Sequence, residues 1–133
     1  MSYDEWRYLA GKRPDATNKR GAATVCGVHG LILLPDNWNG KTFHAGFGDG
    51  WNTNVYDTDT WTDMESSGAI FLPATGYRYE SKMFYVGTGA NYWSSTPDYE
   101  ECSWYLNFND NSVQSMNFGN RFAGASVRLV QDY

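Results

Sequence analysis

The chain has 133 residues, a mass of 15.1 kDa and a formal net charge of −5. This length predicts a single domain over residues 1–133. The acidic balance disfavours nucleic acid as a partner, because a surface that binds phosphates is basic. No apolar run approaches the roughly 20 residues that cross a bilayer as a helix, so no membrane insertion by this chain is expected.

The N-terminal residues predict a short helix followed by a loop. Ser2 and Glu5 have the spacing of a capping box, which predicts a helix over about residues 3–10. Residues 11–21 are polar and predict a loop. The basic cluster in this loop is interpreted as solvated and consists of Lys12, Arg13, Lys19 and Arg20.

A hairpin is predicted next. Residues 22–28 and 31–34 are strand-like, and His29 and Gly30 between them predict a tight turn. Residues 36–57 are rich in Gly, Asn and Trp and predict a long irregular segment rather than regular structure.

A second short helix is predicted over residues 58–67, with Asp59 as its cap and Gly68 as its stop signal. Residues 69–73 then predict a buried strand.

The C-terminal half is predicted to form successive strands over residues 88–96, 103–109, 112–118 and 126–131. In the second of these strands, apolar residues alternate with polar or aromatic ones, which predicts one core face and one outer face. Residues 109–112 have the composition of a turn. The whole pattern predicts an α+β fold with two short helices, a mostly antiparallel sheet and long irregular loops.

No catalytic motif is recognisable, so no catalytic residue, metal site or cofactor is expected. His29 and His44 lack a nucleophile or an orienting acid as partner, and both are interpreted as structural or surface residues. Cys26 and Cys102 leave a disulfide open, although the strand-like run around Cys26 favours a packed free thiol. A calcium site also stays open at three acidic residues that lack the Gly and the final Glu of a calcium loop: Asp57, Asp59 and Asp63.

Residues 98–123 have the make-up of a recognition surface. They lie between two framework-like segments, residues 92–97 and 124–130, and Trp93 in the first of these is interpreted as core. The stretch is rich in Asn, Ser and aromatic residues, which offer adaptable hydrogen bonds and large contact areas. Trp104 shares the phase of Leu106 and Phe108, which favours a core position for it, and it is kept as a candidate beside that interpretation. The candidate ligand-binding residues, expected to form one contiguous outward patch, are Tyr99, Trp104, Tyr105, Asn107, Asn109, Asn111, Ser112, Asn117, Phe118, Gly119, Asn120, Phe122 and Ala123.

Several segments resemble the Fibrobacter succinogenes major paralogous domain, a family common in Bacteroidetes surface proteins and related to the C-type lectin-like and formylglycine-generating-enzyme folds. The similar segments run in order along nearly the whole chain; the most specific are the Tyr-Trp-Ser-Ser-Thr of residues 92–96 and the Ser-Val-Arg-Leu-Val of residues 126–130. The resemblance implies a C-type lectin-like fold.

The tail resembles more closely the variable proteins of diversity-generating retroelements. In these proteins, adenine-directed copying errors turn Asn codons into codons for many other residues, and the scaffold displays the varied side chains to a ligand. The resemblance implies that residues 98–125 carry hypervariable positions, with the five asparagines from Asn107 to Asn120 unmutated or still variable.

The chain also departs from these families. It lacks the calcium-binding triplets of the sugar-binding lectins, and Cys26 and Cys102 do not reproduce the paired cysteines of the formylglycine-generating enzymes. It begins almost at the first helix and shows no signal peptide, so it is expected to be the C-terminal domain of a longer protein.

The resemblance therefore implies a non-enzymatic domain that is displayed on a cell surface or on a phage virion and recognises a protein or glycan receptor on another cell or particle. The alternatives are a structural or adhesin module without diversified residues and, with less support, an enzyme of the formylglycine-generating type.

Overall fold

The computed structural model describes residues 1–40 and 42–130. Its fold is α+β, as predicted, with few short helices and mostly antiparallel strands. The elements in chain order are α1 (Tyr3–Arg7), the π-helix η1 (Tyr8–Lys12), the 3-10 helix η2 (Ala16–Lys19), β1 (Arg20–Val25), β2 (Val28–Leu33), α2 (Gly50–Thr53), β3 (Val55–Tyr56), α3 (Thr58–Ser66), β4 (Ile70–Pro73), β5 (Tyr77–Tyr79), β6 (Lys82–Phe84), β7 (Gly89–Pro97), β8 (Cys102–Asn109) and β9 (Val113–Asn120).

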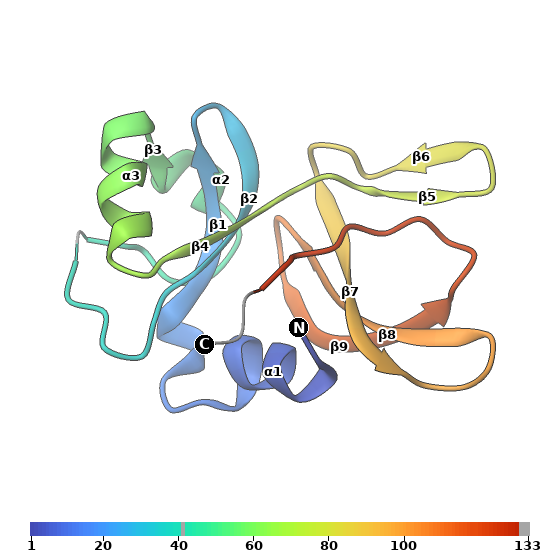
Figure 1. Ribbon diagram of the computed structural model, residues 1–133. Helices are drawn as coiled ribbons and strands as arrows, with labels where there is room; N and C mark the ends of the chain where they lie inside the picture. Colours follow the sequence, from blue (N-terminus) through green and yellow to red (C-terminus); the bar gives the residue numbers. More distant parts are fainter. Residues whose placement is uncertain (41, 131–133) are drawn as a thin grey trace.

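The first sheet has the strand order β3-β1-β2-β4 and is covered on both faces. From β2 onward, Leu31 and Leu33 belong to one core cluster, whereas Ile32 and Leu34 belong to another. Figure 1 shows α3 on one side of this sheet and the strands β7, β8 and β9 on its other side. Burial on both faces explains why this segment is continuously apolar rather than alternating.

Helix α3 packs on the first sheet through Met64, which is buried among β1 and β2 residues, and through Trp61, whose ring lies 5.7 Å from that of Phe71. The predicted helix, its glycine stop and the strand that follows are confirmed. The predicted cap was two residues too late: the side chain of Asp57, not Asp59, accepts the N–H of Thr60 over 2.8 Å.

The second sheet, β7-β8-β9, is antiparallel throughout and confirms three of the four strands predicted in this half. Its inner face contributes Tyr92, Leu106 and Phe108 to the core cluster that also contains Leu31 and Leu33 of the first sheet. One hydrophobic core therefore joins the two sheets.

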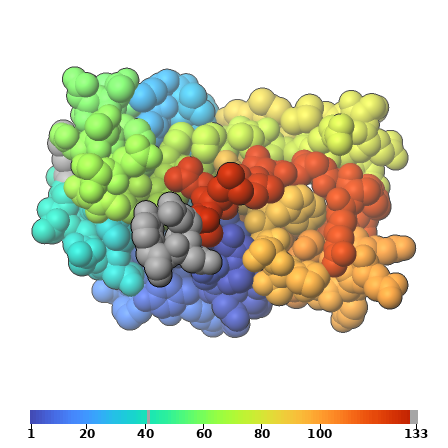
Figure 2. Space-filling model, in the orientation of Figure 1, coloured from blue at the N-terminus to red at the C-terminus, as the bar shows by residue number. Residues whose placement is uncertain are grey.

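Strands β5 and β6 form a separate two-stranded hairpin that extends beside the second sheet (Figure 1). The chain after β9 returns between this hairpin and β7, and Figure 2 shows it lying across the surface there. It is held by paired backbone bonds: Gly124 exchanges two 2.7 Å hydrogen bonds with Arg78, and Ser126 N donates to Asn91 O over 2.9 Å.

The fourth predicted strand, residues 126–131, is wrong as far as it is described. Ser126 makes one bridge to Tyr92, and residues 127–130 form no strand; Gln131 lies outside the described residues. The reason is that one edge of β7 pairs with β8 and its other edge makes only single bridges, from Ala90 to Gly76 and from Tyr92 to Ser126.

The N-terminal helix confirms the capping box. Ser2 Oγ accepts the N–H of Glu5, and a Glu5 carboxylate oxygen accepts the N–H of Ser2. Helix α1 itself ends at Arg7, and η1 continues it to Lys12. Trp6 is buried in the shared core and donates its indole N–H to Trp93 O.

The interpretation of Arg13 as part of a solvated loop was wrong. Its side chain is buried and donates to Leu34 O over 2.6 Å, to Lys19 O over 3.2 Å and to the carboxylate of Asp36 over 3.2 Å. These bonds tie the basic loop to the end of β2 and the residues that follow it.

The hairpin of β1 and β2 exists, but its turn lies earlier than predicted. Cys26 and Gly27 occupy the turn with positive φ angles of 50° and 79°, and His29 and Gly30 are strand residues. The cysteine at this turn is exposed, not packed, and Cys26 and Cys102 are both free thiols. The ring of His29 stacks on Trp51 at 4.2 Å.

The segment after β2 is largely irregular, as predicted, although it also contains the one-turn helix α2 and the short strand β3. In the described part of the chain, no helix has both the length and the apolar character that crossing a bilayer requires.

Candidate ligand-binding pocket

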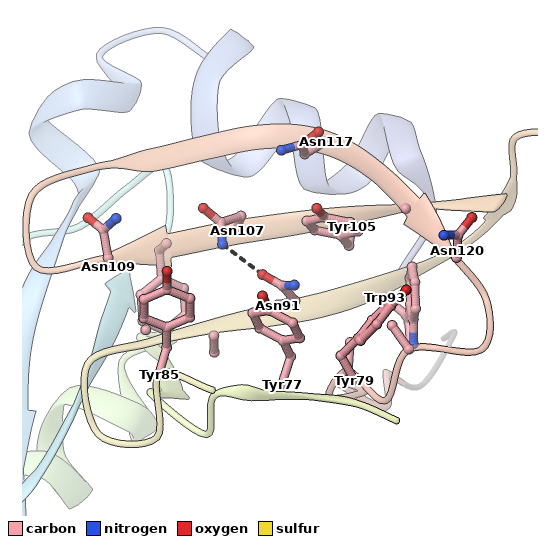
Figure 3. Close-up of a pocket in the computed structure, with 16 residues that line it drawn as sticks. Tyr77, Tyr79, Tyr85, Asn91, Trp93, Tyr105, Asn107, Asn109, Asn117 and Asn120 are labelled. Carbon is pink, nitrogen blue, oxygen red and sulfur yellow. Dashed lines mark hydrogen bonds between the residues drawn. The ribbon is translucent and has the colours of Figure 1, made fainter. Parts of the chain in front are cut away.

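A pocket of about 440 Å³ opens on the outer face of the second sheet. Its floor is the face of β7, β8 and β9 that points away from the shared core, and its wall is the hairpin of β5 and β6 with the residue that follows it (Figure 3). We call it the amide–aromatic pocket, after the residues labelled in Figure 3: Tyr77, Tyr79, Tyr85, Asn91, Trp93, Tyr105, Asn107, Asn109, Asn117 and Asn120.

Strand pairing brings the floor residues together. Asn91 and Trp93 on β7 lie directly opposite Asn107 and Tyr105 on β8, and Tyr105 lies opposite Asn117 on β9. Directly opposed side chains in an antiparallel sheet stand on the same face, roughly 5 Å apart. The alternation predicted for residues 103–109 thus places these amides and rings in one row.

The aromatic residues stand on two sides of the pocket. Trp93 and Tyr105 meet edge to face on the floor, with ring centroids 5.6 Å apart. On the wall, Tyr77 stacks on Phe84 at 5.6 Å, and Tyr85 beside it is 63% exposed. In Figure 3 the labelled tyrosines of the wall rise from the hairpin toward the floor strands.

The asparagines differ in how much of their hydrogen-bonding capacity the protein itself uses. The carbonyl of Asn109 accepts the N–H groups of Asn111 and Ser112 and so holds the β8–β9 turn. The Asn117 amide donates to Gln114, and its carbonyl accepts the N–H of Phe118. These two asparagines have mainly structural roles.

The central amides remain available to a ligand. Asn107 Nδ2 donates to Asn91 Oδ1 over 2.7 Å (Figure 3), and Asn91 is only 9% exposed. Among the described residues, neither the Asn107 carbonyl nor the Asn91 NH2 group has a protein partner. The pair therefore offers one acceptor and one donor group at the floor, each held in place by the other.

Tyr105 occupies its position because Gly119, its diagonal neighbour on β9 opposite Ser103, has no side chain. A Cβ atom at Gly119 would lie 2.9 Å from a ring carbon of Tyr105. Burial, and secondarily the nearby Tyr77, raises the pKa of Tyr105 above its ordinary value. Its hydroxyl thus stays protonated at neutral pH and can donate a hydrogen bond.

The pocket is uncharged. Its lining residues are asparagines, aromatic rings, Gly and Ala, so no Asp, Glu, Lys, Arg, His or Cys is among them. Across residues 1–40 and 42–130, no group of three or more His, Cys, Asp or Glu side chains is arranged to hold a metal ion. The site can form hydrogen bonds and stacking contacts, but it has no charged group to attract an ion.

The structure brings seven of the thirteen candidates from the sequence into this pocket: Tyr105, Asn107, Asn109, Asn117, Gly119, Asn120 and Ala123. Four others lie outside its lining, at or beyond the rim. Tyr99 is exposed after β7, Asn111 and Ser112 form the β8–β9 turn, and Phe122 packs on Tyr79 at 5.4 Å.

The expectation of one patch was wrong for Trp104 and Phe118. They lie directly opposite each other on β8 and β9. Trp104 has the same phase along β8 as the buried Leu106, so both side chains stand on the opposite face of the sheet from Tyr105. There the Trp104 ring packs at 5.6 Å from Phe118 and at 4.9 Å from Tyr3 of α1.

Other pocket residues were missed. Trp93 was interpreted as core. Along β7 it shares the phase of Asn91, whereas the core residues Ala90 and Tyr92 have the other phase, and this alternation was a usable signal that Trp93 faces the pocket. The tyrosines of residues 77–85 gave no usable signal, because strands of three residues are too short to show a pattern.

The chain matches no protein-family model, no curated protein and no solved structure.

Proposed function

We propose that this domain is a non-enzymatic recognition module that binds its ligand in the amide–aromatic pocket. The observation that carries the proposal is the gathering of amides and aromatic rings from three strands and a hairpin into one uncharged cavity. Its volume falls within the roughly 300–1,000 Å³ of typical ligand sites. Rings supply contact area at low entropic cost, and amides adapt their hydrogen bonds to the ligand.

A non-enzymatic role is supported by what lines the pocket. The hydroxyls of its tyrosines are its only titratable groups, and none of these residues is a histidine, cysteine or carboxylate that would act as a nucleophile or general base near neutral pH. The free cysteines, Cys26 and Cys102, do not line the pocket, which disfavours an enzyme of the formylglycine-generating type.

The proposal extends to the fold family. We propose a C-type lectin-like scaffold and a variable protein of a diversity-generating retroelement, with the receptor, a protein or a glycan, on another cell or particle. Support comes from the segments of residues 92–96 and 126–130 quoted above and from the position of Asn107, Asn117 and Asn120 within one pocket.

Sequencing the DNA next to the gene tests the retroelement. The expected result is a near-copy of the 3′ coding end that differs only at adenines, close to a reverse transcriptase gene. The differences should fall in codons of pocket residues such as Tyr105 and Asn107, and should spare core codons outside the pocket such as that of Leu106. Differences spread evenly over both sets would contradict it.

Adhesion tests ligand recognition itself. Beads coated with the domain are applied to panels of bacterial cells and of immobilised receptors, in parallel with two variants. Binding should be lost with Tyr105→Ala in the pocket and kept with Tyr99→Ala, which removes an exposed ring outside the pocket. Equal binding by both variants would favour a structural module whose adhesion does not use this site.

A further inference from the structure

We infer that the amide–aromatic pocket binds a neutral saccharide and does so without a metal ion. This inference rests on the proposed function and names the chemical class of the ligand. It follows from three properties of the pocket: its charge, the pairing of its hydrogen-bonding groups and the arrangement of its rings.

The absence of charge in the lining selects against ionic ligands. A carboxylate or phosphate would find no Lys or Arg there, and an ammonium group or a divalent cation would find no Asp or Glu. Burying an ion without a partner costs much more free energy than burying a hydrogen-bonded neutral group. A neutral ligand is therefore favoured over a charged one of the same size.

The hydrogen-bonding groups match hydroxyls. A sugar hydroxyl donates one hydrogen bond and accepts others, so it is best held between a fixed acceptor and a fixed donor. The Asn91–Asn107 pair presents the free Asn107 carbonyl beside the free Asn91 NH2 group, and their mutual 2.7 Å bond fixes both. Asn120, whose side-chain carbonyl accepts the Cys102 thiol over 3.7 Å, adds a third amide toward the rim.

The rings match the other surface of a sugar. A pyranose carries apolar C–H groups on its faces and hydroxyls on its edge, and aromatic side chains bury such faces favourably. Trp93 and Tyr105 lie beside the amide pair on the floor, and Tyr77 faces them from the wall. The tyrosines of the wall face floor strands that carry both amides and rings, so the cavity offers both kinds of surface to one ligand (Figure 3).

A protein loop fits the pocket less well. Protein recognition surfaces are usually broad, with central anchors and a polar rim that includes charged residues. This site is a cavity of about 440 Å³ without a charged lining residue. That is room for one or two sugar rings or for a few side chains, and the paired amides favour the sugar.

The test uses titrations followed by ¹⁵N–¹H NMR of the whole chain. The probes are the methyl glycosides of glucose, galactose and mannose and the disaccharides maltose, cellobiose and lactose. Glucuronic acid and glucosamine serve as charged probes with the same ring. Each is added to about 50 mM, well above a Kd of about 1 mM. At least one neutral probe should shift the side-chain amides of Asn91 and Asn107 and the indole of Trp93, more strongly than either charged probe. EDTA should leave the shifts unchanged.

Variants then localise the binding. Asn107→Ala and Tyr105→Ala should each weaken binding of that probe at least about tenfold, because one removes the free carbonyl and the other removes a ring of the floor. Tyr99→Ala should leave the Kd unchanged. Thermal unfolding of each variant separates lost binding from lost fold, and the shift map of the unmutated chain does not depend on any variant.

The outcomes separate the inference from the proposed function. Shifts confined to other surfaces, no shift with any neutral probe, or binding abolished by EDTA would each overturn the saccharide inference. If adhesion that depends on Tyr105 nevertheless persists, the pocket takes a different ligand, such as a protein, and the proposed function stands. If that adhesion is absent as well, the proposed function fails too.

Discussion

At the scale of single residues, the direction of a side chain decides its role more than its type does. Trp104 and Tyr105 are consecutive aromatic residues of β8, yet Trp104 packs on Tyr3 of α1 while Tyr105 stands in the pocket. The two-residue period of a strand makes this separation automatic. An aromatic residue on this sheet is therefore a candidate for ligand binding only if it shares the phase of Asn107.

A single carboxylate, that of Asp36, links three N-terminal segments. It accepts the Tyr8 hydroxyl over 2.8 Å and a hydrogen bond from the buried guanidinium of Arg13 over 3.2 Å. The Tyr8 hydrogen bond is the largest cause of a pKa for Asp36 below its ordinary value of 3.8; desolvation opposes it, and Arg13 and Lys19 lower the pKa further.

This shift predicts how stability depends on pH. Because the pKa of Asp36 is lower in the folded than in the unfolded chain, its stabilising contribution is fully present above pH 3.8 and is lost as the pH falls through the folded value. Asp36→Asn should unfold at a lower temperature than the unmutated chain near pH 7. This gap in unfolding temperature should close in acid.

Thermal unfolding from pH 7 to about pH 2 measures that gap. Tyr8→Phe removes the largest cause of the shift and should move the acid-dependent loss to higher pH. A gap of constant size down to the lowest pH would show that the Asp36 charge contributes nothing to folding stability.

At the scale of elements, the hairpin of β5 and β6 builds the pocket wall although it buries little of itself. Its Lys82, Met83 and Phe84 are all exposed, so packing alone holds it weakly. Backbone contacts hold it instead: Arg78 exchanges hydrogen bonds with Gly124, and Gly76 N donates to Gly89 O over 2.7 Å. The wall thus depends on close backbone approach where the hairpin begins.

Gly76→Ala is predicted to disturb this wall. Gly76 has a φ of 71°, and a Cβ there would overlap the Phe84 carbonyl oxygen and lie 2.8 Å from Val86 N. The substitution should cost about 2–4 kcal/mol of unfolding free energy, measured by urea denaturation, and should shift the ring signals of Tyr77 and Tyr85.

Gly87→Ala is the matched control for Gly76→Ala. Gly87 has a similar φ of 78°, but a Cβ there meets nothing within 4 Å. It should show only the cost of the strained backbone, about 1 kcal/mol, and leave the tyrosine signals in place. Equal effects of the two variants would mean that backbone contact at Gly76 does not hold the wall.

At the scale of the whole molecule, the sequence predicted most of what depends on local periodicity. The alternation of residues 103–109 gave the two faces of β8, and the turn composition of residues 109–112 gave the β8–β9 turn, because both signals lie within a few residues. The wall of the pocket depends on contacts between segments more than 30 residues apart, such as Arg78 with Gly124, which no local pattern encodes.

Two local errors also have physical causes. The β1–β2 turn was missed because Cys26 adopts a φ of 50°, which is unusual for a residue other than Gly, Asn or Asp. Arg13 was missed because a buried guanidinium needs carbonyl partners from Lys19 and Leu34, and these come together only in the fold.

The shared core predicts that the two sheets unfold together. Leu106 of β8 is fully buried in the core cluster that also contains Leu31 and Leu33 of β2, so Leu106→Ala removes packing from a core that both sheets share. It should lower the unfolding free energy by about 2–5 kcal/mol, and the urea transitions by circular dichroism and by tryptophan fluorescence should still coincide. Leu129→Ala makes the same chemical change at a side chain that is 86% exposed, and should stay within about 0.5 kcal/mol of the unmutated chain. Separate transitions in Leu106→Ala would instead mean that each sheet has its own independent core, and that the pocket floor unfolds without the rest of the molecule.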